Sequence, residues 1–232
     1  MKVLGIDSAT LTIGIAILDG DRVIAEARHD AKGRTNDLLM TIDRLCREIE
    51  LAPAALDAIA IGAGPGSFTG LRIGMATAKG IAFAAQRPLW AVSSLAALAH
   101  DAISERGADG VIVSILDARK GEVYAGCYDG EAHPVSDERV LAPSAVAEFV
   151  RGVVGDRLAS YVGDAITAYP DVFAPLAGGW FVTTPSGVAV ARLALAGARV
   201  NVTAGGAPTY IRPSEAEVKY PDGVPGALKR NP

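Results

Sequence analysis

The sequence predicts an α/β protein built from two similar lobes. The chain opens with three apolar strands in a meander, a glycine-rich turn joins a buried strand to a long helix, and the second half repeats the spacing of the first. Asp7 precedes the Asp19-Gly20 turn by the same distance as Asp117 precedes the Asp129-Gly130 turn, and an apolar strand lies between them in each half. We therefore predict a duplicated β-β-β-α-β-α unit. The predicted boundaries are an N-terminal lobe at residues 1–106, a C-terminal lobe at 107–213 and a tail at 214–232.

The N-terminal lobe is predicted to begin with the meander, because an Asp-Gly turn between apolar runs is a strong hairpin signal. After a break at residues 33–36, apolar residues recur at the helical period from Asp37 to about Glu50, which predicts an amphipathic helix that Pro53 closes. The expected elements are strands at 1–7, 10–18, 22–29, 58–61 and 89–92 and helices at 37–50, 69–86 and 95–103.

The C-terminal lobe is predicted to repeat this order after a hinge at Gly107 to Gly110. Its first strand ends near Asp117, and its second strand ends at the Asp129-Gly130 turn. The remaining elements expected in this lobe are a strand at 139–141, a helix at 144–151, a strand at 161–163 and a helix at 187–198.

Composition excludes several classes of protein. Hydrophobic residues make up 50% of the chain, charged residues 21%, and the net charge is −4, which argues against an extensive nucleic-acid surface because phosphate binding relies on clustered Lys and Arg. Cys46 and Cys127 stand alone, which indicates buried thiols in a reducing compartment. Asp7 interrupts the first apolar run too early for a signal peptide, and Arg72 and Lys79 interrupt the most apolar helix. We therefore expect a cytoplasmic protein without a membrane span.

The stretch at residues 62–74 contains five glycines, and Gly66, Gly70 and Gly74 recur every four residues. Such density after a buried strand forces a tight strand-to-helix turn, and Ser67 can cap the new helix. A helix N-terminus ringed by glycines can hold a phosphate. The side-chain-free ridge can instead receive another helix, or it can pack closely within its own lobe. Residue chemistry leaves these three interpretations open.

Two acidic turns, one in each lobe, suggest a nucleotide site between the lobes. Backbone N–H groups and hydroxyls can meet phosphate oxygens, and two carboxylates can hold a hydrated Mg²⁺. The alternative is that each aspartate only shapes its own turn by bonding to local backbone. The candidate nucleotide-binding residues are Asp7, Ser8, Thr10, Thr12, Asp117 and Arg119.

Other chemistries find little support in the sequence. His29, His100 and His133 lie far apart and do not form a metal-binding helix motif. The chain has no Gly-x-x-x-x-Gly-Lys-Ser/Thr loop. Ser67 lacks the second glycine of a Gly-x-Ser-x-Gly motif and has no obvious histidine partner. No metal site is therefore predicted.

Several stretches together match one known family. The most specific is the Gly-Pro-Gly-Ser-Phe-Thr-Gly-Leu-Arg-Ile-Gly sequence at residues 64–74. The other matching stretches are Gly5-Ile6-Asp7-Ser8-Ala9-Thr10, Val92-Ser93-Ser94-Leu95, Asp117-Ala118-Arg119, Gly121-Glu122-Val123-Tyr124, Tyr210-Ile211-Arg212 and Glu215-Ala216-Glu217. Through them nearly the whole chain resembles the TsaB (YeaZ) family of tRNA threonylcarbamoyladenosine biosynthesis proteins.

The resemblance implies the two-lobed fold of the actin-like, Hsp70-like and sugar-kinase-like ATPases. It also implies a non-catalytic paralogue that binds the enzyme TsaD and supports transfer of a threonylcarbamoyl group to N6 of adenosine 37, in tRNAs that read codons starting with adenine. The ATPase TsaE completes the bacterial set, and the chain is expected to meet tRNA only through the complex.

The resemblance also bears on cofactors. TsaD-like enzymes hold their metal with a histidine pair on a helix, whereas the matching helix here, at 37–50, carries Met40, Thr41 and Arg44 at its exposed positions. No cofactor is therefore expected to be required by this chain, and binding of ATP or ADP with Mg²⁺ is left open for the complex.

The family resemblance favours helix contact for the glycine-rich stretch, because the first two helices of TsaB-like proteins pair with TsaD or with a second copy of TsaB. Some of the apolar residues must nevertheless pack on the sheet. The predicted interface comprises Leu38, Leu39, Ile42, Leu45, Ile49, Gly66, Gly70, Arg72 and Gly74. On this hypothesis Gly70→Leu or Gly74→Leu weakens pairing and leaves the lobe folded. The alternatives are a stand-alone ATP-dependent phosphotransferase of the same superfamily and an M22-like peptidase.

Overall fold

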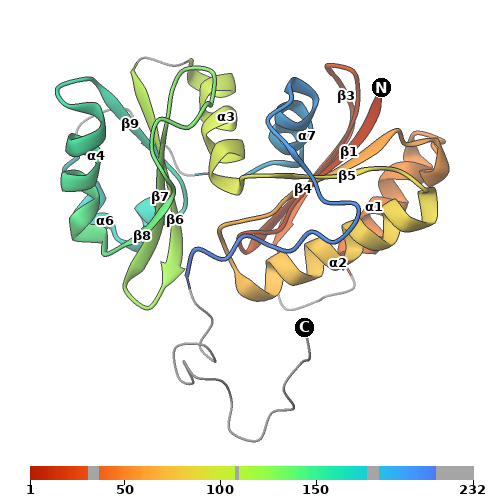
Figure 1. Ribbon diagram of the computed structural model, residues 1–232, viewed down its shortest axis with the longest axis horizontal. Helices are drawn as coiled ribbons and strands as arrows, with labels where there is room; N and C mark the ends of the chain where they lie inside the picture. Colours follow the sequence, from red (N-terminus) through yellow and green to blue (C-terminus); the bar gives the residue numbers. More distant parts are fainter. Residues whose placement is uncertain (31–36, 108–109, 177–182, 213–232) are drawn as a thin grey trace, which may run out of the picture.

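The computed structural model describes residues 1–30, 37–107, 110–176 and 183–212. The predicted break at 33–36, the middle of the predicted hinge and the predicted tail at 214–232 lie outside the described residues. Figure 1 shows two α/β lobes side by side, each built on its own sheet.

The first lobe contains a six-stranded sheet in the order β10-β5-β4-β1-β2-β3. The predicted meander is confirmed, because β1 pairs antiparallel with β2 and β2 with β3, while β1 and β4 run parallel. The strands are β1 (Lys2–Asp7), β2 (Thr12–Asp19), β3 (Arg22–Asp30), β4 (Ala58–Gly62), β5 (Leu89–Val92) and β10 (Val200–Asn201).

Two helices cover one face of this sheet. α1 (Asp37–Glu48) and α2 (Phe68–Ala85) bury their apolar stripes against alternate residues of the strands, and the 3₁₀ helix η1 (Pro53–Ala55) lies between them in the chain. Ser67 accepts a hydrogen bond from the Gly70 N–H at 3.3 Å and so caps α2, as the sequence predicts. Within the described part of the chain, no helix has the length and hydropathy that a membrane crossing needs.

The second lobe contains a four-stranded sheet in the order β8-β7-β6-β9. Three helices form a core against one face of it, and α3 packs on the other face. Its strands are β6 (Val111–Arg119), β7 (Glu122–Tyr128), β8 (Arg139–Leu141) and β9 (Ala159–Val162), and its helices are α4 (Val146–Val154), which follows the 3₁₀ helix η2 (Pro143–Ala145), α5 (Ala165–Ala168) and α6 (Pro170–Phe173).

The internal duplication is visible at the first turn of each lobe. Oδ1 of Asp7 accepts a hydrogen bond from the Ala9 N–H at 2.9 Å, and Oδ1 of Asp117 accepts one from the Arg119 N–H at 2.8 Å. Each aspartate therefore bends its turn by the same bond to the second residue after it. The second turns differ, since β2 and β3 meet at a tight hairpin whereas a longer loop follows Asp129 before β8.

The helix predicted at 187–198 was assigned to the wrong lobe. It forms as α7 (Gly187–Ala196), but it packs on β1, β2 and β4 of the first sheet, and β10 after it extends the same sheet. The contact is close. A Cβ at Gly5 would lie 2.0 Å from the Gly187 carbonyl oxygen, and one at Gly187 would lie 2.5 Å from the Ala16 nitrogen. Glycine at both surfaces lets the helix backbone rest on the strand backbone.

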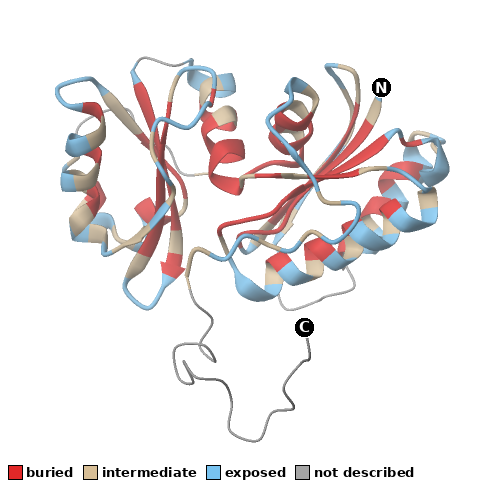
Figure 2. Ribbon diagram, in the orientation of Figure 1, coloured by how far each residue is buried: buried red, intermediate tan, exposed pale blue. Residues whose placement is uncertain are grey.

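α3 (Ser94–Arg106) joins the lobes, and Figure 2 shows its buried residues facing the middle of the molecule. Leu95, Leu98 and Ala102 belong to a single apolar core that includes residues of both sheets and of α7. The two lobes therefore share one core along α3.

Candidate functional site

Asp7, at the end of β1, lies inside the first lobe with no exposed surface. Oδ2 accepts a hydrogen bond from the Ser94 hydroxyl at 2.7 Å, while Oδ1 accepts the Ala9 N–H. A Cβ at Gly62 would lie 1.9 Å from Oδ2, so only a glycine leaves room for the carboxylate beside β4. Asp7 thus connects the end of β1 to the start of α3 from within the core.

Burial raises the pKa of the Asp7 carboxyl to about 7. Loss of water contact is the largest cause, and the hydrogen bonds from Ala9 and Ser94 partly oppose it. A shift of this size often marks a functional site. Here the carboxyl is sealed from solvent, so it cannot contact a hydrated Mg²⁺ or a phosphate in this arrangement.

The neighbouring hydroxyls bond to the protein itself. The Ser8 hydroxyl donates to the Gly70 carbonyl oxygen at 2.9 Å, and the Thr10 hydroxyl donates to the Thr12 carbonyl oxygen at 2.9 Å. The Thr12 hydroxyl lies 3.3 Å from the Asp30 carboxylate. These groups stabilise the turn between β1 and β2.

The ridge of Gly66, Gly70 and Gly74 faces that same turn. A Cβ at Gly66 would lie 2.4 Å from the Ala9 carbonyl oxygen, one at Gly70 2.2 Å from the Ser8 carbonyl oxygen, and one at Gly74 2.1 Å from the Ser8 hydroxyl oxygen. Close packing within the lobe is therefore what these glycines provide. Their part in an interface with another chain stays a prediction.

Three backbone N–H groups of the strand-to-helix loop have acceptors within the protein. The Ala63 N–H donates to the Val92 carbonyl oxygen at 2.8 Å, the Ser67 N–H donates to the Ala9 carbonyl oxygen at 2.7 Å, and the Gly64 N–H lies 3.3 Å from the Ser94 hydroxyl oxygen. These donors point at the protein, which disfavours a phosphate cradle at this loop.

Asp117 has its own set of partners in the second lobe. Its carboxylate accepts the Arg119 N–H, lies 3.0 Å from the Arg119 guanidinium and accepts the Tyr169 hydroxyl at 3.2 Å. Asp164 accepts the Asp117 N–H at 2.9 Å, and its burial raises the pKa of its carboxyl. No hydrogen bond or ion pair between described residues joins Asp117 to Asp7. Nucleotide binding by the two turns stays a prediction, and the structure gives each aspartate a role in its own turn.

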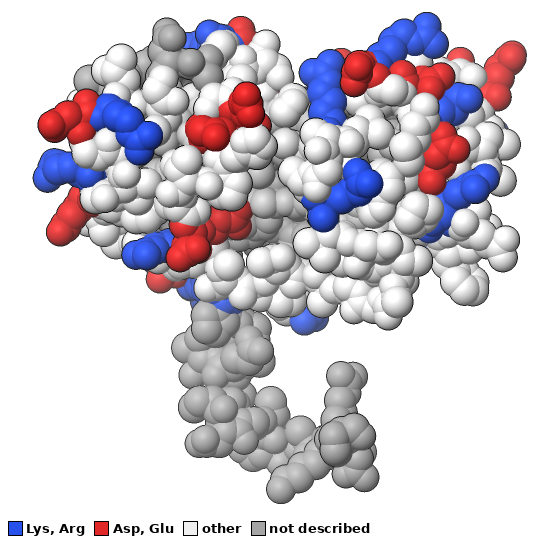
Figure 3. All heavy atoms as spheres, turned by 45° about the horizontal axis from the view of Figure 1, so that its top comes forward, with Lys and Arg blue, Asp and Glu red and all other residues white. Residues whose placement is uncertain are grey.

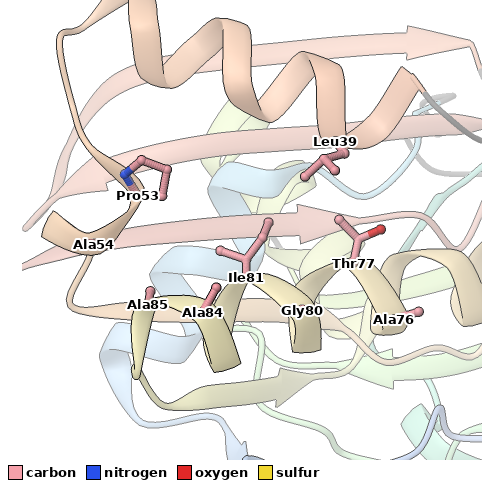
Figure 4. A pocket seen from close by; sticks show the side chains of 9 residues that line it. All are labelled: Leu39, Pro53, Ala54, Ala76, Thr77, Gly80, Ile81, Ala84 and Ala85. Carbon is pink, nitrogen blue, oxygen red and sulfur yellow. The ribbon is translucent and has the colours of Figure 1, made fainter.

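An apolar groove opens to solvent between α1 and α2. It has a volume of about 690 Å³, and Figure 4 shows Leu39 of α1 and Ile81 of α2 pointing into it from opposite sides. η1 forms one wall, and a second hollow of about 390 Å³ continues along α1 past Met40. The groove is lined by Leu39, Pro53, Ala54, Ala76, Thr77, Gly80, Ile81, Ala84 and Ala85.

The predicted interface residues divide between core and surface. Leu38, Ile42 and Leu45 are buried against the sheet, and Ile49 packs against the same core. Leu39 is 57% exposed and lines the groove. Arg72, also predicted, is exposed on α2, where its guanidinium lies 3.7 Å from the centre of the Phe68 ring.

Sequence reasoning missed the outward face of α2. Small residues recur every four positions twice along this stretch: once as Gly66, Gly70 and Gly74, which face the turn between β1 and β2, and again as Ala76, Gly80 and Ala84, which are exposed. A Cβ at Gly80 would meet nothing within 4 Å. The repeat at 76, 80 and 84 was a usable signal, but spacing alone does not tell which repeat faces the sheet.

Two lobes joined by one helix, each opening with an antiparallel meander and an aspartate-shaped turn, define a protein of the actin-like and sugar-kinase-like ATPase fold. The activator of the 2-hydroxyisocaproyl-CoA dehydratase from Clostridium difficile, solved with bound ADPNP, shares this fold at 11% identity with a TM-score of 0.55, covering 85% of this chain and 96% of that one. At such identity the likeness concerns the fold alone.

The chain belongs to the TsaB (YeaZ) family. It is 34% identical to the Escherichia coli tRNA threonylcarbamoyladenosine biosynthesis protein TsaB, over 74% of this chain and 75% of that protein. It is 41% identical to the Bacillus subtilis TsaB over 55% of each chain, so this match spans about half the length of that relative. The family model described as TsaD, tRNA N6-adenosine threonylcarbamoyltransferase, matches residues 28–218.

A solved structure agrees with this family over most of the chain. An uncharacterized protein from Pseudomonas aeruginosa, described as similar to the peptidase YeaZ, is 32% identical and superposes with a TM-score of 0.79, covering 91% of this chain and 99% of that one.

Proposed function

We propose that this chain is a non-catalytic subunit that binds TsaD and supports threonylcarbamoyl transfer to adenosine 37 of tRNA. The observation that carries the proposal is the groove between α1 and α2. Leu39 and Ile81 present apolar side chains to solvent there, and Gly80 leaves the helix surface flat between them. A surface of this kind accepts the apolar face of a partner helix. The proposed occupant is a helix of TsaD, with a second copy of this chain as the competing occupant.

The charge distribution supports contact with tRNA through the complex rather than directly. The chain carries a net charge of −4, and on the face seen in Figure 3 acidic and basic side chains are interspersed. Direct tRNA binding would favour a basic surface. In this proposal TsaE joins the same assembly, and the protein acts in the cytoplasm, where it meets tRNA through TsaD.

The geometry of the aspartates supports a role without chemistry of its own. The Asp7 carboxylate is enclosed by the core, and the three histidines lie on β3, on α3 and in the loop after β7. Within the described residues, no group of three or more His, Cys, Asp or Glu side chains is arranged to hold a metal ion. Ser67, the candidate nucleophile of a peptidase, has its hydroxyl oxygen at the cap of α2.

The test combines binding with activity. This chain is expected to co-purify with TsaD, and unmodified tRNA is expected to gain threonylcarbamoyladenosine when TsaD and threonylcarbamoyl-adenylate are supplied together with this chain, but far more slowly without it. Phosphate release or substrate phosphorylation by the isolated chain would instead favour the phosphotransferase alternative. TsaD that neither binds the chain nor responds to it would contradict the proposal.

A further inference from the structure

Residues 202–212, here called the strap, lead from the edge of the first sheet toward the second lobe (Figure 1). The strap begins as a continuation of β10. The Val202 N–H donates to the Leu89 carbonyl oxygen at 2.9 Å, and the Leu89 N–H donates to the Thr203 hydroxyl oxygen at 2.9 Å. Its start is therefore fixed to β5.

The strap is then held against the beginning of α2. The Thr209 N–H donates to the Ala63 carbonyl oxygen at 2.7 Å. The rings of Tyr210 and Phe68 lie 5.3 Å apart, and Nε of Arg72 donates to the Tyr210 hydroxyl oxygen at 3.1 Å. Up to Tyr210 the strap thus belongs to the first lobe.

Two residues later the chain contacts the second lobe. The Arg212 guanidinium donates to the Ala118 carbonyl oxygen at 2.8 Å and lies 3.1 Å from the Glu122 carboxylate. Both acceptors belong to the β6–β7 hairpin, and the Arg212 side chain is only 27% exposed. A planar guanidinium can meet a carbonyl and a carboxylate together, whereas a lysine amine offers no such fixed fork.

Directional contacts of this kind matter because the rest of the lobe junction is largely apolar. Along α3 the lobes meet through packed alanines and leucines, and hydrophobic attraction itself is non-directional. A second polar contact crosses at the start of α3, where the Ser93 hydroxyl donates to the Glu138 carboxylate. Two separated polar contacts can fix an orientation that one alone leaves free to turn.

We propose that Arg212 is a clasp that fixes the angle between the two lobes, so that this ATPase-type fold is held in one lobe orientation. Loss of the clasp leaves the second lobe free to turn about the Ser93–Glu138 contact. The inference concerns the chain alone and does not depend on the proposed binding of TsaD.

The test measures the distance between the lobes by pulsed electron spin resonance. Spin labels are attached to Lys79→Cys on α2 and Glu148→Cys on α4, both exposed positions, while the native cysteines are buried. The parent chain is expected to give one narrow distance distribution. Arg212→Ala is expected to broaden it or shift its centre, and Arg212→Lys to give an intermediate width.

Arg157→Ala is the matched control, because among the described residues Arg157 donates hydrogen bonds only to the Val153 and Val154 carbonyl oxygens, both inside the second lobe. Its distribution should match the parent. A folded Arg212→Ala chain with the parent distribution, or an Arg157→Ala chain that broadens as much, would overturn the proposal. If circular dichroism shows that Arg212→Ala does not fold, Glu122→Gln, which removes only the ion pair, decides by the same criterion.

Discussion

The Ser94 hydroxyl donates a hydrogen bond to Oδ2 of Asp7 at 2.7 Å, inside a core where neither side chain is exposed. The bond joins the last residue of β1 to the first residue of α3, the helix along which the two lobes meet. A buried carboxyl is costly unless hydrogen bonds satisfy it, and here Ser94 and Ala9 supply them. In the sequence Asp7 resembles a metal ligand, whereas in the structure its carboxyl links the end of β1 to the start of α3 by a hydrogen bond.

Asp7→Asn tests whether the Asp7 carboxyl is protonated in the folded protein. The pKa of Asp7 is raised to about 7 in the folded protein, above its ordinary value of 3.8, so the folded state retains a proton that the unfolded state releases. Stability contributed by this group is present below about pH 4 and is lost as pH rises through about 7. The parent should therefore lose stability relative to Asp7→Asn across this window, by at most roughly 4 kcal/mol.

Urea unfolding of both chains at several pH values provides the measurement. Taking the difference between the two chains removes most of the contribution of groups that titrate in both, including Asp101, whose carboxyl pKa burial raises to about 6. A constant difference between pH 4 and pH 8 would show that Asp7 does not change its protonation in this range.

Gly70→Ala tests the role of the ridge formed by Gly66, Gly70 and Gly74. The added methyl group would lie 2.2 Å from the Ser8 carbonyl oxygen, a backbone atom that cannot move aside without displacing the turn. We expect a loss of stability of about 1–3 kcal/mol from overpacking. Gly80→Ala on the same helix is the control, since its methyl group meets nothing within 4 Å, and it should gain about 0.5–1 kcal/mol from helix propensity.

Thermal unfolding of the two variants measures whether the glycine ridge packs tightly against the turn within its own lobe. If Gly70→Ala unfolds like the parent, the ridge is not tightly packed against the turn. The earlier expectation that Gly70→Leu leaves the lobe folded is replaced by the expectation that it unfolds the lobe.

Ala84→Glu tests the groove as the surface that binds TsaD. Ala84 is exposed, so glutamate leaves the fold intact, but a partner helix would have to bury the new carboxylate without a counter-charge. We expect TsaD to bind at least about tenfold more weakly in a titration. Leu158→Glu is the control, because Leu158 is 75% exposed on the second lobe, and it should bind normally. Equal affinity of Ala84→Glu and the parent would exclude the groove as the binding surface.

Much of the fold is predictable from local patterns. The meander, the strand before the glycine-rich turn and the extent of α1 and α2 follow from period and from turn residues such as Gly20. The packing of a helix on a distant sheet is not predictable in this way. α7 has a good helical pattern, but its docking on the first sheet depends on glycines in β1 and β2 that are far away in the sequence.

The candidate site shows the same limit. The sequence identifies Asp7 and the glycine ridge as unusual, but it does not show that the core encloses Asp7 or that the ridge packs against the turn at Ser8. Leu39 and Leu38 are neighbours on one apolar helix, and only the sheet beneath α1 decides that one is exposed and the other buried. The helical repeat of apolar residues shows which residues share a face of a helix, and the neighbouring elements determine which face remains exposed to solvent.

The placement of α7 has a consequence for biosynthesis. The first sheet receives one of its covering helices and its last edge strand only from residues 187–201, after the whole second lobe has been translated. A nascent chain that has emerged only as far as residue 106 leaves β1 and β2 uncovered on one side. The amino-terminal half therefore cannot complete its packing until residues 187–201 have been synthesised and can fold back onto it.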